Sequence, residues 1–217
     1  MNPKKFAVVL SGNGVFDGAE IHEATLTLYF IKKHGADYEI FAPDIPQYHV
    51  INHITGDEMN ETRNVLVESA RIARGKIKPL SEFNAGDFDV LIFPGGFGAA
   101  KNLSSFAFEG PQLTVNADVE KALKDMAAAG KPIGALCISP VILAKVFGDV
   151  EITIGQDPGT ADAIQQLGAK HKNTGHGEIV IDEKYKLVTT PCYMLDANIV
   201  QIGDGAEKVV KALLEML

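Results

Sequence analysis

The chain has 217 residues, of which 46% are hydrophobic and 22% are charged. This length suits one α/β domain, and the balance excludes a disordered chain. The net charge of −8 argues against nucleic acid as a partner, because proteins that bind it usually carry a basic face. The two cysteines form no Cys-x-x-Cys pair, so we expect neither a disulfide framework nor a metal site.

Membrane insertion and secretion are not indicated by the apolar runs of the sequence. No run approaches the ~18 residues that a membrane span needs, so no membrane partner is expected. The first apolar run, Phe6 to Leu10, ends at Ser11-Gly12 and is too short for the hydrophobic region of a secretory signal. We therefore interpret this run as a first strand and expect a cytoplasmic protein.

Short apolar runs alternate with longer amphipathic stretches, which is the pattern of βα units around a mostly parallel sheet. The stretch 45–60 has no period and contains Pro46 and Gly56, so we interpret it as an excursion or lid. No linker or repeat interrupts the chain, and we expect a single domain over residues 1–217. The predicted elements, in chain order, are strand 6–10, helix 19–34, strand 38–42, helix 61–74, strand 89–93, helix 116–129, strand 132–136, helix 140–146, strand 151–154, a hairpin of strands 178–181 and 186–190, and helix 195–217.

One predicted strand ends on a cysteine in Lys131-Pro-Ile-Gly-Ala-Leu-Cys137-Ile-Ser-Pro140, and a helix is predicted from Pro140. This is the strand–nucleophile–helix arrangement of a nucleophile elbow. A thiol at a helix N-terminus lies near the positive end of the helix dipole, which favours the reactive thiolate. The amide of Ile138 would face a developing oxyanion. A buried core cysteine is the alternative interpretation.

A glycine-rich loop, Pro94-Gly95-Gly96-Phe97-Gly98, follows the preceding predicted strand. Glycines let backbone amides turn toward a ligand without steric cost. In a parallel sheet, both loops would lie at the carboxyl edge, where open α/β sheets bind their ligands. Together they would supply a nucleophile and an oxyanion hole.

Two carboxylates, Glu20 and Glu23, lie three residues apart at the start of the first predicted helix and share one face. A carboxyl that reaches Cys137 could accept its proton or transfer a proton to substrate. The alternative is the ordinary preference of acidic residues for the first turn of a helix. In the loop before this helix, the spacing of Gly12, Gly14 and Gly18 departs from the dinucleotide fingerprint, so we expect no such cofactor.

Two further residues have open interpretations. Cys192 follows a predicted strand and Pro191, which suits core or edge packing; a resolving thiol would need to lie near Cys137. His22 could lie near the thiol or face away from it on its helix.

These motifs together resemble the PfpI-like superfamily, which includes the parkinsonism-associated deglycase and class I glutamine amidotransferase-like domains. Within it, the sequence is most similar to the enhancing-lycopene-biosynthesis family (ElbB-type, isoprenoid biosynthesis glyoxalase). The similar stretches span nearly the whole chain and are Val9–Val15, Asp17–Glu23, Phe41–Asp44, Arg63–Leu66, Ser69–Gly75, Phe93–Ser104, Gly134–Pro140 and Thr189–Pro191.

The resemblance implies a flavodoxin-like doubly wound sandwich, mostly a parallel sheet with helices on both faces, and a strained backbone at Cys137. It also implies a homodimer and a cofactor-free lyase: a glutathione-independent, glyoxalase III-like enzyme that turns methylglyoxal or related 2-oxoaldehydes into 2-hydroxy acids, with a link to isoprenoid metabolism. The family glutamate that contacts the cysteine lies twelve residues before the glycine ending the first helix. Counting back from Gly35 gives Glu23, with Glu20 as the alternative.

The sequence departs from the superfamily pattern at several positions. Ile138 stands where protease-like members carry histidine, and Thr189–Cys192 lacks the His/Glu pair of amidotransferases. Asp157-Pro158 corresponds to a His-Pro of the deglycase relative, which makes Asp157 a candidate third catalytic residue. The competing hypothesis is a non-enzymatic redox-sensing, ligand-binding or chaperone-like protein of the same fold.

Overall fold

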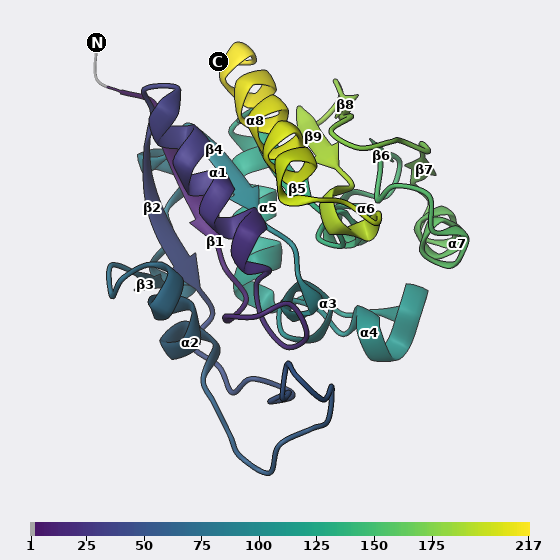
Figure 1. Cartoon of the computed structure of the whole chain (residues 1–217). Coiled ribbons are helices and arrows are strands. Elements are labelled where there is room, and N and C mark those ends of the chain that lie inside the picture. Colours follow the sequence, from purple (N-terminus) through teal and green to yellow (C-terminus); the bar gives the residue numbers. More distant parts are fainter. Residues whose placement is uncertain (1–2) are drawn as a thin grey trace.

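The strands of the computed structural model, which describes residues 3–217, form one large sheet and one small one. They are β1 Lys5–Val9, β2 Asp37–Ala42, β3 Lys78–Pro79, β4 Val90–Phe93, β5 Ile133–Leu136, β6 Glu151–Ile152, β7 Lys170–His171, β8 Val180–Asp182 and β9 Leu187–Thr190. The large sheet has the order β3-β2-β1-β4-β5-β9-β8 and is parallel except for β8 (Figure 1). The carboxyl ends of β1, β4, β5 and β9 therefore meet at one edge.

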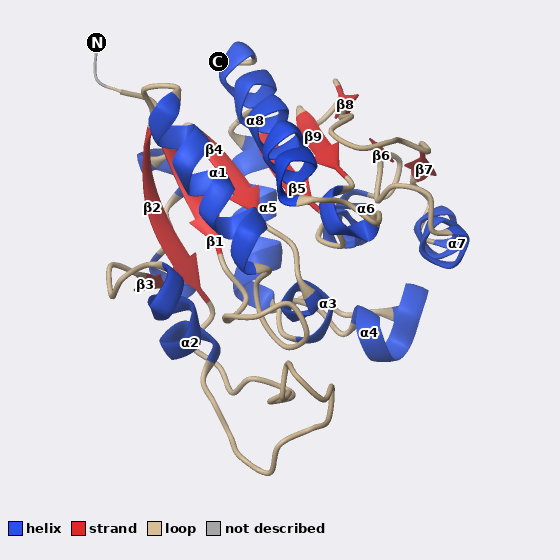
Figure 2. Cartoon of the chain, viewed as in Figure 1, coloured by secondary structure: helices blue, strands red, loops and turns tan. Residues whose placement is uncertain are grey.

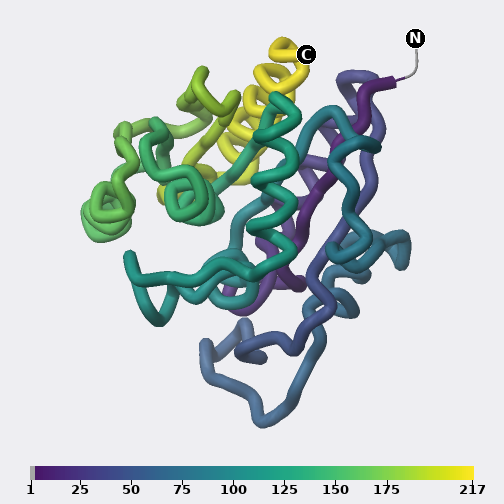
Figure 3. The backbone as a smooth tube through the Cα atoms, turned by 180° about the vertical axis from the view of Figure 1, so that it is seen from behind, coloured from purple at the N-terminus to yellow at the C-terminus, as the bar shows by residue number. Residues whose placement is uncertain are grey.

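Helices cover both faces of this sheet (Figure 2). Helices α1 and α8 pack against each other on one face, and α5 and α6 lie on the other, as the front and back views agree (Figures 1 and 3). This arrangement confirms the predicted doubly wound α/β fold. The helices are α1 Ile21–Lys33, α2 Val65–Ile72, α3 Phe97–Lys101, α4 Phe106–Glu109, α5 Ala117–Ala128, α6 Pro140–Phe147, α7 Pro158–Gln166 and α8 Ile199–Glu215.

The central strands are apolar along their whole length because both of their faces are covered. Every residue of β4 and β5 is buried, as are residues 6–9 of β1. These continuous apolar runs are what the sequence pattern detected. Their burial holds the strand ends, and hence the loops that follow them, in fixed positions at the carboxyl edge.

Two predicted helices begin four residues later than the sequence pattern indicated. Asn64 is in an extended conformation, and its side chain accepts a hydrogen bond from the Val67 amide, so α2 begins after it. At the start of α8, Asn198 and Gln201 form a reciprocal capping box. A side-chain cap satisfies amides that the first helical turn leaves free, and so fixes where the helix starts.

Several short elements were not predicted, namely α3, α4, α7, β3 and β7. The predicted strand 151–154 is only the two-residue β6, which pairs with β7 in a separate sheet. The predicted hairpin is confirmed, because β8 and β9 pair in antiparallel register. In the described residues, no helix is long and apolar enough to span a membrane.

The excursion 45–60 is irregular, as predicted, and folds back on itself through an isolated bridge between Ile51 and Glu58. The Ile51 amide donates to Asp17 Oδ2 at 2.7 Å, and the Tyr48 amide donates to Asn102 Oδ1 at 3.0 Å. These bonds tie the excursion to the loop before α1 and to the end of α3.

Candidate functional site

Cys137 lies directly after β5 at the carboxyl edge of the sheet. Its backbone has φ of 60°, in the left-handed region that non-glycine residues rarely adopt, as the resemblance implied. The Cys137 amide donates to the carbonyl of Thr190 at 2.9 Å, and the residue is only 6% exposed. The amides of Gly96 and Ile138 hydrogen-bond to its sulfur. Strain of this kind is held by the surrounding structure and is common at reactive residues.

The glycine loop approaches the cysteine more closely than any side chain would allow. A Cβ on Gly95 would lie 2.3 Å from the Cβ of Cys137 and 2.7 Å from Glu23 Oε2. Gly96 has φ of 97°, and a Cβ there would lie 2.4 Å from the Glu20 amide nitrogen. Only glycine fits both positions, so the loop can present its amides to the thiol.

Of the two candidate carboxylates, the structure brings Glu23 to the thiol. Glu23 is fully buried and hydrogen-bonds to the Cys137 thiol. Its Oε2 accepts from the Gly95 amide at 2.9 Å, and its Oε1 accepts from the Tyr193 amide at 3.3 Å. Glu20 instead caps α1, because its carboxylate accepts from the Glu23 amide at 2.7 Å. The helix cap therefore orients the residue whose side chain enters the site.

Burial controls the protonation of both groups. Loss of solvation, followed by the nearby charge of Glu20, raises the pKa of Glu23 to about 8. Burial also raises the pKa of the Cys137 thiol, although the amides of Gly96 and Ile138 act in the opposite direction. The expectation that the helix N-terminus would favour a thiolate is wrong for the resting site, because desolvation outweighs it. Near neutral pH, the resting pair is a thiol beside a mainly protonated carboxyl group.

Asp157 caps a helix that was not predicted. Its Oδ2 accepts from the Thr160 amide at 2.7 Å, and the hydrogen bonds from the Thr160 side chain and then from this amide lower the pKa of the exposed carboxyl. In the structure, Thr160 lines the cavity beside Cys137, whereas Asp157 lies outside that lining. The observed contact of Asp157 is thus with its own helix.

A cavity of about 230 Å³ opens beside the thiol. Apart from Cys137, Tyr193 and Thr160, its lining is apolar or glycine. The neighbouring short helices α3 and α4 contribute much of it. The full lining is Val15, Gly96, Phe97, Ala100, Phe106, Ala107, Cys137, Ile138, Thr160, Tyr193 and Met194.

Tyr193 was missed by the sequence reasoning, although it follows a strand that ends at the same edge. Its amide donates to Glu23 Oε1, the residue is among those that line the cavity, and its hydroxyl lies 2.8 Å from His22 Nδ1. His22 therefore connects to the site through Tyr193. The available signal was the position of Tyr193 just beyond Thr190-Pro191, at the carboxyl end of β9.

Cys192 is buried, with φ of 44°. Burial, then the nearby Glu23 and Cys137, raises the pKa of its thiol. Its burial suits packing, and its position near Cys137 meets the condition for a resolving thiol, so both interpretations stay open.

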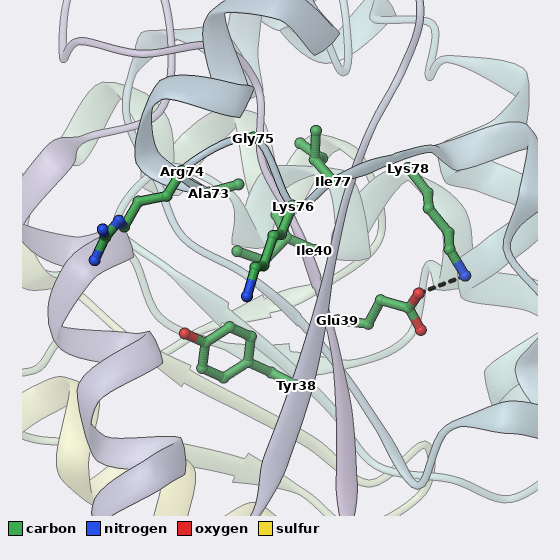
Figure 4. Close-up of a pocket in the computed structure, with 9 residues that line it drawn as sticks. All are labelled: Tyr38, Glu39, Ile40, Ala73, Arg74, Gly75, Lys76, Ile77 and Lys78. Atoms are coloured by element: carbon green, nitrogen blue, oxygen red, sulfur yellow. Dashed lines mark ion pairs between the residues drawn. The ribbon is translucent and has the colours of Figure 1, made fainter.

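A larger hollow lies elsewhere, along β2 and the segment between α2 and β3 (Figure 4). It measures about 690 Å³ and is lined by the cations Arg74, Lys76 and Lys78, the last paired with Glu39 at 2.5 Å. Cations just beyond a helix C-terminus stabilise the helix dipole. No group of three or more His, Cys, Asp or Glu side chains that could hold a metal occurs among residues 3–217.

Comparison with known proteins gives matches along nearly the whole chain. The profile of the DJ-1/PfpI family matches residues 14–191. The chain is 50% identical to the rat "ES1 protein homolog, mitochondrial", covering 98% of this chain and 84% of that protein. It is also 50% identical to the human "Glutamine amidotransferase-like class 1 domain-containing protein 3, mitochondrial", covering 98% of this chain and 83% of that protein.

Among solved structures, an Ehrlichia chaffeensis isoprenoid biosynthesis protein with an amidotransferase-like domain has a TM-score of 0.91 at 31% identity, with 98% of this chain and 100% of that chain covered. Glyoxalase III from Candida albicans has a TM-score of 0.61 at 16% identity, covering 99% of this chain and 97% of that one. The second likeness shows the shared fold alone.

The relatives overturn the expected cytoplasmic location. The rat and human proteins, and a 37% identical zebrafish ES1 protein, are all named mitochondrial. The prediction of a cytoplasmic protein is therefore wrong, since these relatives point to mitochondria. Neither a missing secretory signal nor a missing membrane span distinguishes the cytoplasm from a mitochondrial compartment.

Proposed function

This chain belongs to the DJ-1/PfpI family, and on that premise we propose that it is a glutathione-independent glyoxalase acting through Cys137. The reaction converts a 2-oxoaldehyde such as methylglyoxal into a 2-hydroxy acid. One observation carries the proposal: a thiol, a carboxyl group with a pKa of about 8 and two inward amides converge beside a small cavity. No organic cofactor is needed for the reaction as written.

In the first step, Cys137 Sγ bonds to the aldehyde carbon while the carbonyl oxygen lies against the amides of Gly96 and Ile138. The thiol proton passes to Glu23, and the proton that Glu23 carried passes to the oxygen. The product is a neutral hemithioacetal. Because protons move as the bond forms, the step does not require a thiolate in the resting site.

The second step is an isomerisation without any external oxidant. A carboxyl group with a pKa of about 8 is populated in both protonation states near neutral pH, so it can act as base and then as acid. After Glu23 releases to solvent the proton that it received from the thiol, its carboxylate takes the proton from the first carbon, giving an enediolate, and returns that proton to the second carbon. The hydroxyl proton moves from the first oxygen to the second, and a thioester results. Water then cleaves the thioester, releasing the 2-hydroxy acid and the free thiol.

Tyr193 is placed to assist the transfer between the two oxygens. Tyr193 is one of the residues that line the cavity, and its hydroxyl lies 2.8 Å from His22 Nδ1. We assign this pair the role of relay. The exposed cap Asp157 has no role in the proposed steps.

A redox-sensing protein of the same fold is the alternative function. Peroxide sensing favours a thiol that is ionised and accessible. Here Cys137 is only 6% exposed, and this limited access does not favour sensing.

The assignment to an ElbB-type subgroup, with a link to isoprenoid metabolism, belongs to the same proposal. It is supported by the original resemblance and by the 31% identity to a protein named for isoprenoid biosynthesis. The homodimer also remains a prediction, which sedimentation of the purified chain would test.

The test is lactate formation from methylglyoxal without glutathione, by the wild type, Cys137→Ser and Cys192→Ser. We expect turnover by the wild type and by Cys192→Ser, because Cys192 is outside the proposed chemistry. The rate of lactate formation by Cys137→Ser should be at least about a thousandfold lower than that of the wild type, because a hydroxyl beside the same carboxyl is a far weaker nucleophile than a thiol. Absence of turnover in the wild type would overturn the proposal.

A further inference from the structure

The cavity beside Cys137 is larger than methylglyoxal requires. Its volume of about 230 Å³ equals the share of about seven or eight liquid water molecules at roughly 30 Å³ each. Methylglyoxal carries only a methyl group beyond its two carbonyls. Once its aldehyde carbon is bonded to Cys137, room remains for a longer tail.

The walls of this cavity suit carbon rather than polar groups. Val15, Phe97 and Phe106 line it from the loop before α1 and from α3 and α4, and Met194 lines it from the segment after β9. Methionine and aromatic side chains adapt well to apolar ligands. A polar tail would lose its water in this cavity with few groups to replace it.

Charge complementarity for an anionic tail is also lacking. No Lys, Arg or His is among the cavity-lining residues of the described chain. Lys101, next to Ala100 of the lining, instead donates to the Phe16 carbonyl at 2.9 Å and lies over the ring of Phe97. The cations of the hollow in Figure 4 line a different surface.

We propose that the preferred substrate is an uncharged 2-oxoaldehyde with a branched or aromatic carbon tail, which packs against Val15, Phe97, Phe106 and Met194. This inference rests on the proposed function and names the substrate class of that same site. The chemistry at Cys137 is unchanged: the tail supplies binding energy, and the aldehyde carbon is the one attacked. Methylglyoxal is then a poor, undersized substrate.

The kinetic experiment compares kcat/KM for methylglyoxal, 4-methyl-2-oxopentanal and 4,5-dioxopentanoate. Each buried methylene raises an equilibrium constant by about fourfold, so the three extra carbons of the branched aldehyde predict about a 60-fold gain in kcat/KM over methylglyoxal. The dioxopentanoate has a similar length but ends in a carboxylate, and its kcat/KM should fall below that of methylglyoxal. Equal values for the three, or the highest value for methylglyoxal, would overturn the inference while leaving the glyoxalase intact.

A variant that fills the cavity tests the location of the tail. Ala107 lines the cavity and is exposed on α4, so Ala107→Phe is compatible with folding. We expect it to lower kcat/KM for 4-methyl-2-oxopentanal at least tenfold more than it lowers kcat/KM for methylglyoxal. Ala128→Phe, on the exposed end of α5, is the matched control and should change neither. Equal losses for both substrates in Ala107→Phe would contradict the assigned location.

Alkylation rates distinguish a wrong substrate class from a wrong reaction. Cys137 is modified with N-benzyl iodoacetamide, iodoacetamide or iodoacetate, and each rate is divided by that of N-acetylcysteine. The inference predicts that this rate ratio is at least about tenfold higher for the benzyl reagent than for iodoacetamide. It predicts a ratio at least about tenfold lower for iodoacetate than for iodoacetamide. Both differences are expected even in a protein without turnover. Three equal ratios would refute the apolar, uncharged class. Absence of turnover for every oxoaldehyde, with the ordered ratios retained, would refute the glyoxalase reaction alone.

Discussion

Replacing Glu23 by glutamine should change how stability depends on pH. Glu23 is fully buried, and its pKa rises from an ordinary 4.5 to about 8 on folding. Between these values the folded chain holds a proton that the unfolded chain releases, so the free energy of unfolding falls as pH rises. The slope is about 1.4 kcal/mol per pH unit for one proton. Glutamine cannot ionise, so the part of this fall in unfolding free energy that Glu23 causes is absent from Glu23→Gln.

The size of the effect follows from the two pKa values. Relative to the fully protonated state, the ionisable carboxyl costs the wild type about 1 kcal/mol near pH 5 and about 3 kcal/mol near pH 7. Between pH 5 and pH 7, the free energy of unfolding of Glu23→Gln should therefore rise by about 2 to 2.5 kcal/mol relative to that of the wild type. The glutamine NH2 group opposite the Gly95 or Tyr193 amide adds a penalty of about 1–3 kcal/mol, which is independent of pH and cancels from the comparison.

The assay is urea unfolding followed by far-ultraviolet circular dichroism, at half-unit intervals from about pH 5 to pH 7.5. Cys137→Ser is the control, because it keeps Glu23 and should keep most of the wild-type slope. A difference between Glu23→Gln and the wild type that stays constant within about 0.5 kcal/mol over this range would refute the reasoning. It would mean that Glu23 is already ionised in the folded protein.

Three further substitutions test other parts of the site. Gly95→Ala should reduce lactate formation at least a hundredfold and lower the melting temperature, because the new Cβ would lie 2.3 Å from the Cβ of Cys137; wild-type rates in this variant would show that the loop is not packed on the thiol. Tyr193→Phe should lower kcat about tenfold with little change in KM, and an unchanged kcat would remove the relay from the mechanism. Asp157→Ala should cost about 1 kcal/mol of unfolding free energy in urea titrations through loss of a helix cap. Lactate formation by that variant should stay within about twofold of the wild type, and a collapse of kcat would instead place Asp157 in the reaction.

The parts of the fold that the sequence predicted are those in which burial acts on both faces of an element. The apolar runs of β4 and β5 had to be central strands, and the predicted helix 116–129 agrees with α5, which Asn116 caps, to within one residue at each end. The starts of α2 and α8 were missed because the cap lies inside a longer stretch with helical spacing. The four- and five-residue helices α4 and α3 are too short for periodicity to appear, and tertiary packing fixes them.

The candidate site was predictable only where chain order determines position in space. Cys137 and the glycine loop follow neighbouring strands, so their meeting at the carboxyl edge could be inferred. Residue spacing alone left Glu20 and Glu23 open, and the resemblance favoured Glu23; the observed cap bond of Glu20 explains the difference in their roles. Burial of the thiol depends on α3, α4 and Tyr193 together, which is why its raised pKa was not foreseen.

The most direct test of a thiol-based glyoxalase is the intact mass of the protein, acid-quenched during turnover of methylglyoxal, with lactate measured in the same samples. Acid preserves a thioester but lets a hemithioacetal revert. The mechanism predicts a wild-type chain heavier by one methylglyoxal, with the group on Cys137, while lactate accumulates. It predicts neither this adduct nor lactate for Cys137→Ser, and no acid-stable adduct for Glu23→Gln. Lactate formed by Cys137→Ser at the wild-type rate would contradict the role of this thiol.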